Sequence, residues 1–334
     1  MKFGMLVMNQ YLPHESMAAK LREGVEQVRA CRDAGFDLIS LGQHYLAAPY
    51  QMPTSLPFLG RLTAETGEMQ VAATVLLVPL HNPVEMAESV ATLDALCDGR
   101  FVLGVGLGYR DEEYQAFGVR RQDRVGRFME ALELMKLLWT EEEVEFHGRF
   151  YQLPRVRPAT RPVQKPHPPI WVAANHDTAI QRAARLGYCW LINPHATMAM
   201  VRDQLIGYQQ ARGAVGTTSP SDLPLMRELS IHQDRAQALT LSQPYLESKY
   251  QAYADWGQDK ALPGEESFRV PFVDLARDRF LIGNPEEVVG EIRRYEEDLG
   301  VNYMIFRLQW PGMPHQEAMR QIQLMGREVI PHFR

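Results

Sequence analysis

The chain has 334 residues, of which 46% are hydrophobic and 23% are charged, a composition typical of a globular protein and unlike that of a disordered one. Its net charge of −6 offers no basic surface to nucleic acid or anionic lipid, so we expect a small-molecule ligand. The longest strongly apolar stretch, 71–80, is far shorter than the roughly 18 residues of a membrane span, and the start of the chain has no signal-peptide pattern, so a cytoplasmic location is expected.

Short apolar runs alternate with helical patterns from the first residues onward. Their continuous apolar character is typical of parallel strands covered on both faces, and the helices between them supply the crossovers. The pattern fits either a closed barrel or an open doubly wound sheet. The eight predicted strands are Phe3–Val7, Leu38–Leu41, Gln70–Val75, Phe101–Val105, Ile170–Ala173, Cys189–Ile192, Leu225–Ile231 and Tyr303–Leu308.

A histidine, His44, follows the second predicted strand directly. In a barrel this position lies at the mouth of the active site. An imidazole there can donate or accept a proton beside a bound cofactor. Taken alone, a histidine at this position is more often an ordinary polar loop residue.

Two helix starts have clear capping signals. Asn82 and Asn284 are each followed by a proline at the first helical position and a glutamate at the third, which predicts helices beginning at both asparagines.

The fourth predicted strand ends in a glycine-rich segment, Gly104-Val105-Gly106-Leu107-Gly108-Tyr109-Arg110. The dinucleotide fingerprint GxGxxG fails, because the third glycine is at 108 and the segment lies too far along the chain for an opening βαβ unit. Glycines without a Cβ still let the backbone approach a flat ring or a phosphate closely. A tight strand-to-helix turn explains the same residues.

A second candidate site is the segment Asn175-His176-Asp177-Thr178, which leads from the fifth predicted strand into a helix near Thr178. The free N–H groups and the dipole of a helix amino terminus favour a bound phosphate. Plain capping of the helix by Asp177 or Thr178 is the alternative.

Two stretches interrupt the alternation of strands and helices. The proline-rich segment 141–169 is expected to be a long surface excursion. Residues 237–278 form an apparent insertion after the seventh strand, where barrel enzymes place lids.

Several common catalytic and metal-binding signals are missing from the sequence. HExxH, His-x-His and clustered carboxylates are not found, so no metal centre is expected, and the serine-hydrolase signal GxSxG is missing as well. The three cysteines, Cys31, Cys97 and Cys189, are too few and too scattered for a disulfide framework and are interpreted as reduced, buried thiols.

Taken together, the segments resemble the bacterial-luciferase-like family of flavin-dependent monooxygenases and their deazaflavin-dependent relatives, in order and over nearly the whole chain. The segments that carry the resemblance are MKFGMLVMNQ, GFDLISLGQHY, VAATVLLVPLHNPVEMAE, DGRFVLGVGLGYRDEEYQAFG, PPIWVAANHDTAIQRAARLG and FLIGNPEEVVGEIRRYEEDLGVNYMIFRL. The resemblance favours the closed barrel, a single-domain α/β fold of the (β/α)8 TIM-barrel type over residues 1–334, with the insertion at 237–278.

The resemblance also implies roles for individual residues. His44 matches the histidine beside the flavin. The family's non-prolyl cis peptide under the flavin ring falls at Thr74 and Val75. The turn along the ring and ribityl chain matches Gly106, Gly108 and Tyr109, with Arg110 as a substitute for a phosphate-contacting arginine that Leu107 replaces. The phosphate-binding turn matches Asn175, His176 and Thr178.

The expected function follows from this family membership. We expect a two-component monooxygenase that takes reduced FMN from a separate flavin reductase, binds molecular oxygen as a C4a-hydroperoxyflavin and oxidises a small apolar organic substrate. The alternatives are a deazaflavin-dependent reductase or dehydrogenase that transfers a hydride on the same fold, and a non-catalytic flavin-binding subunit. The resemblance further implies a homodimer. Gly106 replaces the reactive cysteine of the light-emitting chain, and Gln43 and Tyr45 replace the acidic residue and the histidine on either side of His44, which argues against light emission.

Overall fold

The structure is a computed structural model that describes residues 1–216, 222–264 and 266–334. Its main sheet has nine parallel strands. Their order across the sheet is β10-β9-β11-β1-β2-β3-β4-β7-β8. The strands are β1 (Lys2–Leu6), β2 (Leu38–Leu41), β3 (Gln70–Leu77), β4 (Phe101–Gly106), β7 (Ile170–Ala173), β8 (Cys189–Leu191), β9 (Pro224–Ile231), β10 (Phe280–Gly283) and β11 (Tyr303–Arg307).

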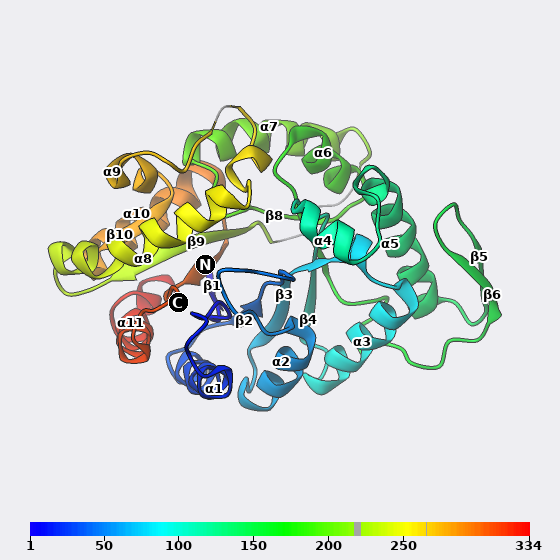
Figure 1. The fold of residues 1–334 in the computed structure, drawn as a ribbon, viewed down its shortest axis with the longest axis horizontal. Helices are drawn as coiled ribbons and strands as arrows, with labels where there is room; N and C mark the ends of the chain where they lie inside the picture. Colours follow the sequence, from blue (N-terminus) through cyan, green and yellow to red (C-terminus); the bar gives the residue numbers. More distant parts are fainter. Residues whose placement is uncertain (217–221, 265) are drawn as a thin grey trace.

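Helices surround the sheet and supply the crossovers between its strands (Figure 1). Both predicted capping signals are confirmed: Asn82 accepts a hydrogen bond from the Val84 N–H at 2.9 Å, and Asn284 forms a capping box with Glu287. The helices are α1 (Met17–Asp33), α2 (Ser55–Leu62), α3 (Pro83–Leu96), α4 (Asp111–Ala116), α5 (Arg124–Thr140), α6 (Asp177–Arg185), α7 (Met198–Gly213), α8 (Arg235–Asp255), α9 (Phe272–Ala276), α10 (Pro285–Leu299) and α11 (His315–Glu328). In the part of the chain that the structure describes, no helix has the length and apolar character needed to cross a membrane.

The sheet differs from the prediction by one strand. All eight predicted strands are present, but β10 was not foreseen, because its four residues directly precede the strong capping signal at Asn284 and resemble the approach to a helix. A parallel bridge joins Ile192, just after β8, to Leu225 in β9. The predicted eight-stranded barrel is therefore confirmed in a coarser form, as a curled parallel sheet of nine strands.

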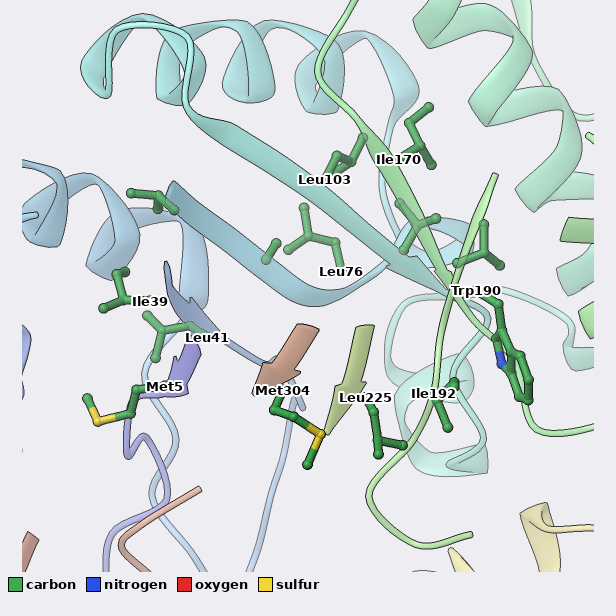
Figure 2. Packing of buried hydrophobic residues seen from close by; sticks show 14 of the residues in the cluster. Met5, Ile39, Leu41, Leu76, Leu103, Ile170, Trp190, Ile192, Leu225 and Met304 are labelled. Atoms are coloured by element: carbon green, nitrogen blue, oxygen red, sulfur yellow. The ribbon is translucent and has the colours of Figure 1, made fainter. Parts of the chain in front are cut away.

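Side chains on the two faces of the sheet form separate cores. One face packs against the surrounding helices in the largest hydrophobic cluster, part of which is seen in Figure 2, where Met5, Leu41 and Met304 are labelled. The other face forms a smaller cluster that collects residues from eight of the nine strands, all except β10. Its members are Leu6, Leu38, Ala72, Val102, Trp171, Cys189, Leu191, Met226, Tyr303 and Ile305. Because successive side chains of a strand point to opposite faces, continuous apolar runs are what such a sheet requires.

The two predicted interruptions leave the main sheet. Residues 141–169 contain an antiparallel hairpin of β5 (Val144–His147) and β6 (Gln152–Val156), which was not predicted and which lies at one edge of the molecule (Figure 1). The segment 237–278, whose residue 265 lies outside the described residues, consists mainly of α8 and α9 and packs on a separate aromatic cluster with Phe280 and Trp310.

Candidate active site

A cavity of about 320 Å³ lies where the main strands end. Parallel strands place their carboxyl ends at one rim, so residues that are far apart in the sequence converge there. The lining residues come from the ends of most strands and from α8 with the loop after it. They include Gln10 after β1, His44 after β2, Thr74 and Val75 in β3, Gly106 to Tyr109 at the end of β4, Asn175 and His176 after β7, Asn193 and His195 after β8, Met226 in β9, Lys249 and Tyr253 in α8, Lys260 in the loop after α8, and Arg307 at the end of β11.

His44 faces this cavity and is held from behind by Glu113 of α4. The imidazole Nδ1 lies 3.1 Å from Glu113 Oε1, and the same oxygen accepts a hydrogen bond from the Tyr45 N–H at 2.8 Å. The Glu113 side chain is only 1% exposed. Because a carboxylate can only accept, Nδ1 carries the hydrogen, which leaves Nε2 free to exchange a proton with a ligand.

Strands β3 and β4 form a smooth wall of the cavity. The peptide bond between Thr74 and Val75 is cis, as the resemblance implies. A Cβ on Gly106 would lie 2.8 Å from Val75 Cγ2, and Gly108 has a φ of +83°, which favours glycine. These residues therefore leave room for a flat ligand beside the backbone.

Three polar side-chain atoms on residues that line the cavity are buried and lack a hydrogen-bond partner among the described residues: Thr74 Oγ1, the Tyr109 hydroxyl and Asn193 Nδ2. Burial raises the pKa of Tyr109 well above its ordinary value, so this phenol is a neutral hydrogen-bond donor. Buried polar groups are almost always satisfied. Polar atoms of a ligand bound in the cavity are the expected partners of these three atoms.

The turn at Asn175 and His176 lies at the cavity, as predicted, and leads into α6. His176 is the N-cap and makes no side-chain capping bond, so capping by Asp177 or Thr178 is not what these residues do. Thr178 is exposed and does not line the cavity. The free N–H groups at the start of a helix favour a bound anion, and Arg121 and Arg124 line the same cavity.

Arg110 also lies outside this cavity. Its buried guanidinium donates to the carbonyl oxygens of Tyr45 at 2.7 Å and Leu46 at 3.0 Å, pairs with Glu112 and lies 4.6 Å from the Trp256 ring centre. The arginine therefore ties the loop after β2 to the start of α4. Of the ten predicted site residues, Arg110 and Thr178 are the two that the structure does not bring to the cavity.

Sequence reasoning missed the side of the cavity formed by β11 and α8. Arg307, an arginine closing an apolar strand, gave a usable signal, because a charge at the carboxyl end of a parallel strand is placed at the rim. Lys249 and Tyr253 gave none, because they are two residues among many polar ones on a long helix. Among residues 1–216, 222–264 and 266–334, no group of His, Cys, Asp or Glu could hold a metal ion.

Comparison with known proteins agrees with this arrangement. The family profile described as luciferase-like monooxygenase matches residues 1–302. The F420-dependent glucose-6-phosphate dehydrogenase of Segniliparus rotundus is 26% identical over 94% of this chain and 94% of its own. The crystal structure of monooxygenase RslO1 from Streptomyces bottropensis superposes with a TM-score of 0.89 at 25% identity, covering 100% of both chains.

A flavin-bound structure has a similar fold. The oxygenating constituent of 3,6-diketocamphane monooxygenase from Pseudomonas putida, solved with FMN, has a TM-score of 0.82 at 16% identity over 99% of this chain and 98% of its own. The profile match covers most of the chain, and its relatives are named as monooxygenases and dehydrogenases. The protein is therefore an enzyme of the luciferase-like monooxygenase family of oxidoreductases.

Proposed function

We propose that the protein is a monooxygenase that uses reduced FMN and molecular oxygen to oxidise a small organic substrate. The observation that carries this proposal is that His44, Thr74 and Gly106 line one cavity from three neighbouring strands. The FMN-bound relative has the same fold. Reduced flavin, when bound, supplies the electrons that activate oxygen, and the protein supplies the surroundings.

The residues present fit a flavin. The backbone of β3 and β4 would contact the ring system, and Thr74, Tyr109 and Asn193 would satisfy its polar edge with atoms that are otherwise unpartnered. The Asn175–His176 turn with Arg124 would hold the phosphate. His44 would exchange a proton through Nε2, while Glu113 fixes its tautomer and orientation.

We also propose that the whole chain is one domain and that eight of the nine strands form the family's closed barrel, with β10 as an added strand beside β9. The inner cluster from eight strands and the bridge between Ile192 and Leu225 support closure. A homodimer and a separate flavin reductase, expected from the family resemblance, belong to the same proposal.

The test compares the reoxidation of photoreduced FMN by oxygen with and without the protein in stopped flow. We expect the bound reduced flavin to react with oxygen in a protected, long-lived phase that free FMN does not show. For turnover, His44→Ala should lower kcat by about 10²- to 10⁴-fold with FMN affinity retained. His147→Ala, which changes an exposed histidine of the β5–β6 hairpin, is the matched control. Equal turnover of both variants would remove His44 from the mechanism.

A deazaflavin-dependent hydride transfer is the second candidate. It is favoured by Arg121, Arg124 and Lys260 on the cavity wall, because the acidic tail of such a cofactor needs a basic surface. The sequence relative from Segniliparus rotundus is named as F420-dependent. Tight binding of F420, together with reoxidation of reduced FMN at the rate of the free flavin, would reverse the ranking of the two candidates.

A further inference from the structure

The wall of the cavity formed by β11 and α8 carries a positive charge without a matching carboxylate. Arg307 ends β11, and its Nη1 donates to Gln10 Oε1 at 2.9 Å and lies 3.5 Å from the Tyr253 hydroxyl. Both partners are neutral. In the described part of the chain, Arg307 takes part in no ion pair within 4.0 Å. Glu228, which lies opposite Arg307 on the neighbouring strand β9, is paired with Lys249.

Lys249 of α8 lies beside Arg307 and also lines the cavity. Its ammonium group is paired with Glu228, and each of the two side chains is 1% exposed. Burial, the largest effect, and the nearby Arg307 lower the pKa of Lys249 to about 7, against the opposing influence of Glu228. With Lys249 protonated, the ion pair and Arg307 together carry one net positive charge in a buried environment, which is costly without a counter-charge. An anion bound at Arg307 would supply that counter-charge and favour the protonated lysine.

Beyond Glu228, which is paired with Lys249, the neighbouring groups do not supply that counter-charge. Burial and the cations Lys249, Arg307, Arg279 and Arg227 hold the pKa of His195 well below its ordinary value, so this imidazole is neutral. Arg279 is paired with Glu266, and Arg227 does not line the cavity and donates to the Asn193 carbonyl oxygen at 3.0 Å. The excess positive charge on the wall of the cavity is therefore centred on Arg307.

This charged wall is distinct from the turn at 175–176. In the sheet, β1, β2, β3 and β4 lie between β11 and β7 on one side, and β9 and β8 lie between them across the bridge from Ile192 to Leu225. His44 follows β2, which lies between β11 and β7 in the order of strands. A cofactor with its phosphate at Asn175 and His176 would leave Arg307 to the second ligand.

We infer that Arg307, with Gln10, Tyr253 and Lys249 around it, is a recognition site for a carboxylate on the substrate. The inference rests on the proposed function for the identity of that second ligand as substrate. The planar fork of a guanidinium matches the two oxygens of a carboxylate. A single guanidinium without a carboxylate partner fits a monoanion better than a phosphate dianion. The substrate expected from the family resemblance to be apolar is on this inference an organic acid.

The test measures the binding of benzoate and of its neutral isostere benzamide to the full-length protein by isothermal titration calorimetry. Because hydrogen bonds to charged groups are strong, we expect the wild type to prefer benzoate by at least about tenfold. Arg307→Gln should abolish the preference. Gln10→Glu should also abolish the preference for benzoate, because it places a carboxylate against the Arg307 guanidinium. If Arg307→Gln does not fold, the result for Gln10→Glu tests the inference instead. Arg124→Gln, the matched control, should keep the preference for benzoate and lose affinity for FMN.

The inference would be overturned by equal binding of benzoate and benzamide to the wild type, by a preference for benzoate that survives in Arg307→Gln or Gln10→Glu, or by tighter binding of phenyl phosphate than of benzoate. A loss of FMN affinity in Arg307→Gln would also overturn it, by assigning the guanidinium to the cofactor. If the protein prefers benzoate but neither binds FMN nor protects it from oxygen, the proposed monooxygenase function is wrong, while the carboxylate site at Arg307 is still supported.

Discussion

The contact between β3 and β4 at Gly104 allows a sharp test of how the flat wall of the cavity is built. A Cβ at residue 104 would lie 2.1 Å from the carbonyl oxygen of Ala73 and 3.4 Å from the Thr74 Cα. Both atoms belong to the backbone, so no side-chain rotation can relieve the overlap. Gly104→Ala would therefore force the two strands apart beside the Thr74–Val75 peptide, where their register already shifts.

The expected cost follows from this geometry. Contacts below 3.0 Å are essentially never found for a real Cβ, so the strands must separate by roughly 1 Å, which overpacks a filled core and weakens the neighbouring ladder hydrogen bonds. We expect the free energy of unfolding to fall by about 3 kcal/mol or more. FMN affinity should fall as well, because the displaced backbone is the proposed ring contact.

Guanidinium denaturation followed by circular dichroism measures the effect, with the slope of the transition checked for constancy. Gly290→Ala in α10 is the matched control, because its new Cβ meets no atom within 4 Å and alanine is the better helix former by about 1 kcal/mol. That variant should be slightly more stable than the wild type. A Gly104→Ala protein within about 0.5 kcal/mol of the wild type, the range of ordinary surface substitutions, would refute the reasoning.

The remaining predictions concern the site and the thiols. Glu113→Gln removes the charge behind His44 and keeps a hydrogen-bond acceptor. In steady-state kinetics we expect kcat to fall by roughly ten- to hundredfold with little change in KM. An unchanged kcat would show that Glu113 does not contribute to catalysis through His44. Arg124→Ala should weaken FMN binding by about tenfold in a fluorescence titration, with phosphate-free riboflavin as the insensitive control ligand. Burial raises the pKa of Cys97 to about 11 and that of Cys189 to about 12, so both thiols stay protonated below those values. We expect a thiol reagent at pH 8 to label the unfolded protein but not the native protein. Fast labelling of the native protein would contradict the burial of the two thiols.

Local sequence signals determined much of the architecture. Continuous apolar runs bounded by capping residues predicted eight parallel strands and their crossovers, because a strand buried on both faces has no polar side to show. The capping residues Asn82 and Asn284 defined two helix starts, because the bond that a cap makes lies within three residues of it. The position of His44 after a strand also predicted its place at the rim. These features depend only on neighbours in the chain.

The chemistry of the cavity was decided by tertiary structure alone. The Glu113 carboxylate that fixes His44 is 69 residues away in the chain, and Gln10 meets Arg307 across 297 residues. Neither pairing leaves a periodic or local signature, since both arise from the order in which the strands assemble. Arg110 and Thr178 seemed equally suited to a ligand by type and position, yet the direction of their side chains, set by the packing of α4 and α6, takes them out of the cavity. Local patterns fix which residues reach the rim, and long-range packing fixes which of them face one another.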